Sequence, residues 1–171
     1  MKFWIIADMH LGHPKLIEDK LRPIGYSEKI LKNLFRMVTT NDILIDLGDI
    51  CFDDCAMWHE RLAELPCRRW LIKGNHDSMS ISWYLSHGWS MICDSLSLKM
   101  YGKNVLFSHI PLVDTGYDLN IHGHFHSFTM ERIKEKEPQI YSILNPKHRL
   151  VNIEVTHYQP LTLEYLCKDK K

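Results

Sequence analysis

The stretch Ile43-Leu44-Ile45-Asp46-Leu47-Gly48-Asp49 places a short apolar run directly before a glycine and a carboxylate. An apolar run of this length, rich in β-branched residues, is typical of a buried strand. Similar runs occur at residues 3–7 and 69–72, and segments with apolar residues at helical spacing separate the three runs. Strands that alternate with helices predict a largely parallel sheet in this half of the chain.

Two helices are expected between these strands. The first is predicted to have Ser27 as its N-cap and to continue through Val38. The second is predicted to begin at Asp53 or Asp54 and to end near Leu65, because the proline that follows stops a helix. The N-terminal half is therefore expected to have the order β-α-β-α-β.

Strand signals dominate the second half of the chain. Residues 95–100 and 104–108 flank Tyr101-Gly102-Lys103, which predicts a hairpin. The remaining elements are expected as strands at residues 119–122, 149–155 and 161–166, and as short helices at residues 80–86 and 130–136. Two packed sheets flanked by helices accommodate this mixture, so we predict an α/β fold.

Length and composition indicate one ordinary soluble domain. A chain of 171 residues has too little interior for two good cores, so a single domain is expected over residues 1–171. The 21 acidic residues balance the 21 Lys and Arg residues, so no overall field draws the protein to a polyanion. We expect no strong nucleic-acid binding and no membrane partner, and the oligomeric state stays open.

The N-terminal apolar run, from Phe3 to Ala7, ends at Asp8. A run of this length is too short for a signal peptide or for a membrane span. We therefore expect a cytoplasmic location.

Five cysteines occur at irregular spacing and without a C-x-x-C pair. An odd number at such spacing argues against a disulfide framework and against a thiolate zinc site. Reduced, mostly buried thiols are expected, and the alternative is a redox pair of Cys51 and Cys55, which lie at helical spacing.

Side chains that bind metals gather where the predicted strands end. The loops carry Asp8 and His10, then Asp49, then Asn75, His76 and Asp77, then His109, and finally His124 and His126. Because the carboxyl ends of parallel strands lie along one edge of a sheet, these loops are expected to face one another. Glycines directly before Asp49, Asn75 and His124 fit a backbone that turns sharply or approaches an ion closely.

Carboxylate, imidazole and amide groups without sulfur favour Mn, Fe, Zn, Ni or Co as the metal. Even without His76 and Asp77, the loops carry seven such groups, which are too many for one tetrahedral ion. They suit two divalent ions that share a carboxylate and together bind a phosphoryl group. The alternative is a set of core polar residues that satisfy one another, but burying so many of them without an ion is costly.

The ordered pattern Asp-x-His, Gly-Asp, Gly-Asn-His-Asp, His, Gly-His-x-His resembles the calcineurin-like metallophosphoesterases, and it runs from residue 8 to residue 126. Residues 151–154, with Tyr158 and Pro160, look like the end of the small bacterial and viral members. The resemblance implies a four-layer α-β-β-α sandwich of two mixed sheets flanked by helices.

The resemblance also implies a ligand set for two divalent transition-metal ions, with Mn favoured. One ion would be held by Asp8, His10, Asp49 and His126, and the other by Asp49, Asn75, His109 and His124. Asp49 would bridge the ions and act in catalysis through a bridging hydroxide that attacks phosphorus in line. His76 corresponds to the catalytic histidine of the family, and His76 and Asn75 are expected to contact the substrate phosphate.

His13 and Arg22 are further candidates for substrate binding. The bend at Gly12 would bring His13 back over the pocket mouth, and an Arg-Pro pair such as Arg22-Pro23 resembles a feature of a subgroup of small phosphoesterases. The alternative is that His13 braces the loop and Arg22 is solvated.

The remaining polar residues receive structural interpretations. Asp53 and Asp54 are expected to cap a helix, Asp77 to support its loop or to orient a histidine, and His122 to be packed. Structural or exposed positions are expected for the other histidines, namely His59, His87, His148 and His157.

The function favoured by these residues is hydrolysis of phosphate esters, with small phosphodiesters such as nucleotides or cyclic nucleotides preferred over monoesters. Extra cationic clamps for a monoester dianion are represented only by Lys15, Lys73 and Arg22. The alternatives are a nuclease for short or single-stranded ends and a metal-binding scaffold without turnover. His76 is present and no ligand position of the pattern is substituted, which favours the enzyme.

Overall fold

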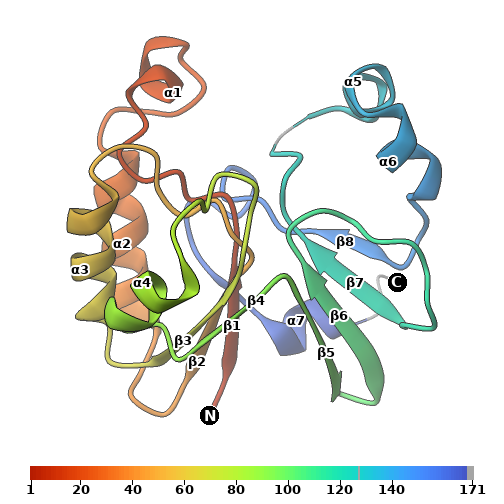
Figure 1. Cartoon of the computed structure of the whole chain (residues 1–171). Coiled ribbons are helices and arrows are strands. Elements are labelled where there is room, and N and C mark those ends of the chain that lie inside the picture. Colours follow the sequence, from red (N-terminus) through yellow and green to blue (C-terminus); the bar gives the residue numbers. More distant parts are fainter. Residues whose placement is uncertain (127, 169–171) are drawn as a thin grey trace.

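The first of two β-sheets divides the molecule, with helices on one side and the second sheet on the other (Figure 1). The computed structural model describes residues 1–126 and 128–168. The first sheet has the order β4-β3-β2-β1-β9. Its strands are β1 (Phe3–Ile6), β2 (Ile43–Asp46), β3 (Arg68–Ile72), β4 (Met91–Cys93) and β9 (Leu161–Thr162). Strands β1 to β4 are parallel, whereas β9 is antiparallel to β1.

The second sheet has the order β5-β6-β7-β8 and is also mixed. Its strands are β5 (Ser95–Met100), β6 (Lys103–Ser108), β7 (Leu119–His122) and β8 (His148–Leu150). Strands β5 and β6 form an antiparallel hairpin, as predicted, and β6, β7 and β8 are parallel.

Helices cover the outer face of the first sheet and one end of the second (Figure 1). They are α1 (Pro14–Glu18), α2 (Tyr26–Met37), α3 (Cys55–Ala63), α4 (Ile81–Ser86), α5 (Met130–Lys136), α6 (Pro138–Ile143) and α7 (Leu163–Cys167). Helices α2, α3 and α4 pack on the first sheet, and α5 and α6 lie near the end of β7 and β8 (Figure 1). The predicted α/β fold of two mixed sheets with flanking helices is confirmed, and α7 contributes Leu163, Leu166 and Cys167 to the core between the sheets.

Strand β1 shows how alternation builds two cores. Trp4 and Ile6 belong to the core beneath α2 and α3, whereas Phe3 and Ile5 belong to the core between the two sheets. Successive side chains of a strand point to opposite faces, so a strand that is apolar throughout must be covered on both sides. This explains the continuous apolar runs before the polar loops.

Two predicted strands in the C-terminal part are wrong in extent. The strand expected over residues 149–155 ends at Leu150, after which Asn152 bonds the carbonyl of His126 and accepts a hydrogen bond from the Val155 N–H at 2.8 Å. Val151 and Ile153 are buried in different cores, and this produced the strand-like alternation.

The strand expected over residues 161–166 is also wrong beyond Thr162. The Thr162 hydroxyl caps α7 by accepting from the Tyr165 N–H at 3.3 Å. Leu163, Leu166 and Cys167 then face the core at helical spacing. The sequence analysis also missed three short elements, which are β4, α1 and α6.

The predicted helix starts need correction. Helix α2 begins one residue after Gly25, and the hydroxyl of Ser27 accepts from the Gly12 N–H at 3.1 Å rather than capping the helix. Asp54 stands at the N-cap position of α3, but its side chain makes no capping hydrogen bond. The Asp53 carboxylate accepts instead from the Asp54 N–H at 3.0 Å.

The expectation of reduced cysteines is wrong for one pair. A disulfide joins Cys51 and Cys55, whose Cα atoms lie 5.5 Å apart, a separation that suits this bond. The chain turns after Cys51, and α3 begins at Cys55, so the two side chains meet. Cys67, Cys93 and Cys167 are free thiols.

No helix in the described part of the chain is long and apolar enough to cross a membrane.

Candidate metal centre

The predicted ligands come from loops that follow strands of both sheets. The parallel strands β1, β2 and β3 deliver their loops to one edge of the first sheet, and β6 and β7 deliver theirs from the second. The structure brings these residues together at that edge: Asp8, His10, Asp49, Asn75, His109, His124 and His126.

One half of the cluster contains Asp8, His10 and His126. The Nε2 atoms of His10 and His126 lie 3.2 Å apart, and Nε2 of His126 lies 3.8 Å from Oδ1 of Asp8. One ligand atom from each of these three residues lies within 4.8 Å of those of the others. These atoms therefore surround a space that suits one ion.

The other half contains Asn75, His109 and His124. Oδ1 of Asn75 lies 3.0 Å from Nε2 of His109 and 3.1 Å from Nδ1 of His124. His109 also belongs to a group with Asp8 and Asp49, whose ligand atoms all lie within 4.8 Å of one another.

Asp49 stands between the two halves. A single oxygen of this residue, Oδ2, lies 3.6 Å from Nε2 of His10 and 3.4 Å from Nε2 of His109. The other oxygen, Oδ1, accepts from the His76 N–H at 2.9 Å. The carboxylate is therefore fixed in the place that a bridging ligand would need.

Burial and mutual contact shift the pKa values of the cluster in opposite directions. Burial raises the pKa of Asp8 to about 6, although His126 and His109 oppose it. Burial would also raise the pKa of Asp49, but the hydrogen bond and charge of His109 outweigh it and bring the value to about 2. Burial lowers the pKa of His10 to about 3, and nearby His126 adds to the effect.

His109 responds the other way. Burial lowers its pKa, but the hydrogen bond and charge of Asp49 outweigh that and raise the value to about 9. The buried Asp49 and His109 thus stabilise each other's charged forms.

The backbone at the predicted ligands is held in an unusual conformation. Five of them have φ values of 44–76°, in the left-handed region: Asp8, His10, Asp49, His124 and His126. Residues other than glycine adopt this region sparingly, and such residues tend to gather at functional sites. The loops are therefore shaped to aim side chains.

Two of the glycines are required by close approach of a carboxylate. A Cβ atom at Gly123 would lie 2.5 Å from Oδ2 of Asp8, and one at Gly74 would collide with the carboxylate of Asp49. The positions that the sequence analysis marked for close backbone approach thus meet the predicted ligands themselves.

The outward-facing ring nitrogens of His109 and His124 have fixed partners. Nδ1 of His109 lies 2.7 Å from the carbonyl oxygen of Leu47, and Nε2 of His124 lies 2.9 Å from Oε2 of Glu137. Each partner orients its ring, so that the other ring nitrogen faces the cluster and could bind an ion in place of a proton.

The donor set fits divalent transition-metal ions. The inward atoms are carboxylate oxygens, an amide oxygen and imidazole nitrogens, and no sulfur is among them. Burying so many acceptors side by side is unfavourable without a cation to pair with them. The chemistry of these residues therefore agrees with the predicted metal centre.

Asp77 supports the loops rather than the inner cluster. Its Oδ2 atom accepts from the N–H groups of Asp49 and Gly74, each at 2.8 Å, and Oδ1 accepts from the Ile50 N–H at 3.2 Å. This carboxylate ties the loop after β2 to the loop after β3, as the sequence analysis expected.

His76 lies at the mouth of the centre. Its side chain is 48% exposed, and its Nε2 atom is 4.0 Å from Oδ2 of Asp49. A group in this place can reach both the solvent and a molecule held against Asp49, which suits proton donation to a leaving group.

His13 also faces the mouth, next to an exposed phenyl ring. The rings of His13 and Phe52 are stacked at 3.8 Å with an angle of 9°, and the centroid of His13 is 6.1 Å from that of His10. The bend at Gly12 thus returns His13 toward the centre, as expected. Sequence reasoning had not singled out Phe52, which is 51% exposed.

The position of Arg22 does not fit the expected substrate contact or the solvated alternative. Its side chain is 0% exposed. Its guanidinium donates to Oε1 of Glu154 at 2.6 and 2.9 Å, to the Met9 carbonyl at 2.6 Å and to the Asp8 carbonyl at 2.8 Å. Arg22 therefore braces the loop after β1 from beneath.

Glu154 connects this brace to His126. Its Oε1 atom lies 3.5 Å from Nδ1 of His126. Burial would raise the pKa of Glu154, but His126 and Arg22 together lower it to about 2. Glu154 and Glu137 are thus the carboxylates behind His126 and His124. Sequence reasoning assigned neither a role, and only the resemblance at residues 151–154 touched one of them.

The histidines predicted to be structural lie away from the inner cluster. His122 is buried, with Nδ1 2.9 Å from the Gly123 carbonyl, and burial lowers its pKa to about 3. His59 accepts from the Trp89 indole N–H at 2.9 Å. Nε2 of His148 lies 3.1 Å from the hydroxyl oxygen of Tyr117.

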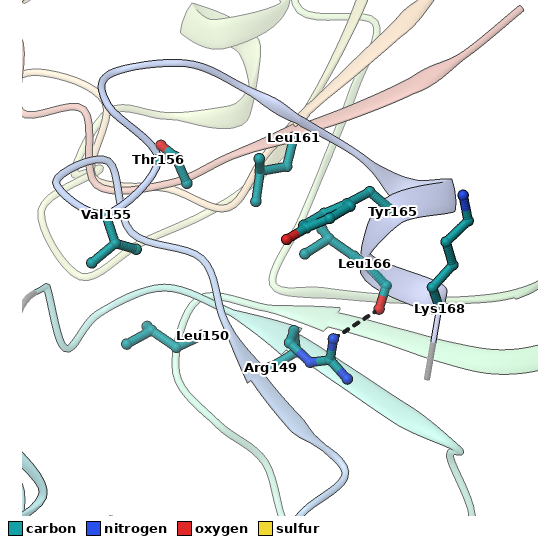
Figure 2. A pocket seen from close by; sticks show the side chains of 8 residues that line it. All are labelled: Arg149, Leu150, Val155, Thr156, Leu161, Tyr165, Leu166 and Lys168. Atoms are coloured by element: carbon teal, nitrogen blue, oxygen red, sulfur yellow. Dashed lines mark hydrogen bonds between the residues drawn. The ribbon is translucent and has the colours of Figure 1, made fainter. Parts of the chain in front are cut away.

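A separate cavity of about 440 Å³ is bordered by β8, β9 and α7 (Figure 2). Leu150, Leu161 and Leu166 line it, and Arg149 at its edge donates to the carbonyl of Leu166 at 3.2 Å. None of the predicted site residues lines this cavity.

Known proteins resemble this chain in sequence and in fold. The model of the calcineurin-like phosphoesterases matches residues 1–170. The uncharacterized protein MJ1445 of Methanocaldococcus jannaschii is 27% identical over 180 residues, which cover 98% of this chain and 90% of that protein. The crystal structure of AQ665, a protein of unknown function from Aquifex aeolicus, has a TM-score of 0.75 and 26% identity, covering 96% of this chain and 97% of that chain. The Pseudomonas putida nuclease MPE shares the fold, with a TM-score of 0.51 and 23% identity over 72% of this chain and 61% of its own.

Proposed function

Because the chain belongs to the calcineurin-like phosphoesterase family, we propose that it hydrolyses small phosphodiesters, of the nucleotide or cyclic-nucleotide type, at a centre of two divalent transition-metal ions. The observation that carries the proposal is the position of Asp49, whose Oδ2 atom lies between His10 and His109 at 3.6 and 3.4 Å. One carboxylate oxygen shared by two groups of donors is what a two-ion centre requires.

The residues divide into two holding groups that share one bridge. Asp8, His10 and His126 would hold one ion, Asn75, His109 and His124 the other, and Asp49 both. When bound, the ions supply Lewis acidity, which lowers the pKa of a water and offsets phosphate charge. Mn is the favoured metal, and Fe, Zn, Ni and Co also suit these ligands.

His76 would act on the leaving group. Its half-exposed ring stands beside Asp49 at the mouth, where it can contact a phosphate oxygen and give a proton to the departing alkoxide. Asn75 would contact the same phosphate, and His13 would border the entrance. Arg22, enclosed beneath the loop after β1, has no part in substrate contact in this proposal.

A small ester is proposed as the substrate because the chain carries no net charge to hold a polymer. We further propose that residues 1–171 form one domain that acts in the cytoplasm without a membrane or strong nucleic-acid partner. The fold shared with a nuclease makes cleavage of short or single-stranded nucleic-acid ends the second candidate.

The test begins with protein stripped of metal by a chelator. Mn²⁺, Ni²⁺, Zn²⁺ and Mg²⁺ are restored separately, and monoesters, diesters, cyclic nucleotides and short single-stranded DNA are offered as substrates. Diester turnover that needs added metal is expected. Monoester turnover alone would contradict the diester assignment, and cleavage limited to DNA ends, with steep salt dependence, would favour the nuclease.

Two variants separate the enzyme from a scaffold. His76→Ala is expected to keep metal binding and to lower kcat by about 10²- to 10⁴-fold. Asp49→Asn is expected to lose both tight metal binding and activity. A wild-type chain that binds two ions and cleaves none of these esters would be a scaffold.

A further inference from the structure

Glu137 stands at the junction of two helices beside the metal centre. Its N–H ends α5 by donating to the Ile133 carbonyl at 2.8 Å, and its own carbonyl begins α6 by accepting from the Tyr141 N–H at 2.9 Å. Pro138 occupies the first turn of α6, where its fixed φ suits a helix start. The backbone of Glu137 is therefore held from both sides.

The Glu137 carboxylate reaches one ligand of the proposed second ion. Oε2 lies 2.9 Å and Oε1 3.1 Å from Nε2 of His124. Side-chain exposure is 28% for Glu137 and 18% for His124, so solvent competes only in part for this bond. Two carboxylate oxygens around one ring nitrogen fix the proton on Nε2.

The opposite nitrogen of His124, Nδ1, is thereby turned toward the cluster, where a bound ion would take the place of its proton. Nδ1 faces Oδ1 of Asn75 at 3.1 Å, and the same oxygen lies 3.0 Å from Nε2 of His109. The ring plane of His124 is thus set by a residue outside the donor set. A histidine without such a partner would sample both tautomers and other ring orientations.

Apolar side chains of the helix pair and of the same loop border one small cavity. Ile133 of α5 is buried, and it lines a small cavity with Phe125, Leu144 and Leu150. Phe125 follows His124 directly in the chain. The helices α5 and α6 therefore have a fixed base from which Glu137 can reach His124.

We infer that Glu137 is a positioning residue for the second metal site, which it serves by holding Nε2 of His124 so that Nδ1 faces the ion. This inference rests on the two-ion centre proposed above. It also gives α5 and α6 a function, since they carry to the site a carboxylate that neither sheet supplies.

Three variants of the full chain test the inference. Glu137→Ala removes the acceptor, Glu137→Gln keeps an acceptor oxygen without the charge, and Glu135→Ala is the matched control on the exposed side of α5. Mn²⁺ is titrated into chelator-treated protein by calorimetry. Glu137→Ala is expected to weaken one of two Mn²⁺ sites by about 10- to 100-fold, with Glu137→Gln between it and the wild type and Glu135→Ala unchanged.

A second readout follows the ring itself without metal. Imidazole ¹⁵N chemical shifts of His124 are expected to show a proton held on Nε2 in the wild type and a lower occupancy of that proton in Glu137→Ala. Identical shifts and identical Mn²⁺ affinities in these two proteins would overturn the inference. If the wild type bound a single ion, the two-ion proposal would fail, and the ¹⁵N comparison would still decide the role of Glu137.

Discussion

His124 and His126 lie two residues apart, yet carboxylates of two different kinds stand behind them. Glu154 faces His126 from the interior and is neutralised by Arg22, whose side chain is fully buried. Glu137 faces His124 from the rim of the molecule, and no cation that the structure describes is paired with it. The interior pair should therefore contribute to folding, whereas the rim carboxylate should affect mainly the site.

This difference follows from where each carboxylate originates. Arg22 and Glu154 are 132 residues apart in sequence, and together they join the loop after β1 to the segment after β8. Glu137 is only 13 residues from His124. Both residues lie in the connection between β7 and β8. A buried pair between distant segments can separate only if the surrounding structure unfolds. A local, partly exposed contact can open while the rest of the fold stays intact.

The largest effect on stability is expected from Arg22→Met. The substitution leaves the Glu154 carboxylate with His126 alone and removes the donor to two loop carbonyls, which should lower the free energy of unfolding by about 3–5 kcal/mol. Urea unfolding of chelator-treated protein measures this. Arg61→Met, which breaks the exposed pair of Arg61 with Glu28 at 2.5 Å, is the control and should change it by about 1 kcal/mol or less. Equal losses in the two variants would contradict a special role for the buried pair.

A smaller, pH-dependent effect is expected from Glu154→Gln. Folding lowers the pKa of Glu154 from 4.5 to about 2, so the stability that it contributes is fully present above about pH 4.5. That contribution, up to about 3 kcal/mol, is lost as the pH falls toward 2. The variant should therefore be less stable than the wild type at pH 7 and should lose less stability between pH 5 and pH 2.

Unfolding midpoints in urea across this pH range, without metal, provide the measurement. Glu28→Gln, at the exposed pair, should flatten the curve far less, because solvent screens its partner. A Glu154→Gln curve parallel to that of the wild type would show that the charge of Glu154 is not coupled to folding.

The smallest effect on folding is expected from Glu137→Gln. Its half-exposed contact should change the free energy of unfolding of the metal-free chain by about 1 kcal/mol or less. Thermal unfolding with and without Mn²⁺ distinguishes an effect on the fold from an effect on metal binding, since bound metal stabilises only the native state. The metal-induced rise in Tm should be smaller in Glu137→Gln than in the wild type, whereas the metal-free Tm should match. A large loss of metal-free stability would place Glu137 with the interior pair.

The inner cluster could be predicted because local signals mark it. Asp49, Asn75 and His124 each follow a glycine at the end of an apolar run, and the parallel order of the strands brings those ends together. The structure has these residues at one edge, and a Cβ at Gly74 or Gly123 would meet a carboxylate of the cluster.

The supporting contacts of Arg22, Glu154 and Glu137 could not be predicted, because the partners of these residues are set by the tertiary structure. Arg22 looked like an exposed residue beside a proline, and nothing local indicates that it would be enclosed with Glu154. Glu137 lies in a charged stretch with Glu135 and Lys136, and only the start of a helix at Pro138 distinguishes it. The strand expected over residues 149–155 failed for a related reason: its apolar residues enter two different cores through a turn.

The central claim is that the seven residues hold two ions that share Asp49. Its most direct test is the anomalous difference density of a crystal of this protein grown with Mn²⁺. Two peaks are expected, one among Asp8, His10, Asp49 and His126 and one among Asp49, Asn75, His109 and His124. A single peak, or two peaks without Asp49 between them, would contradict it.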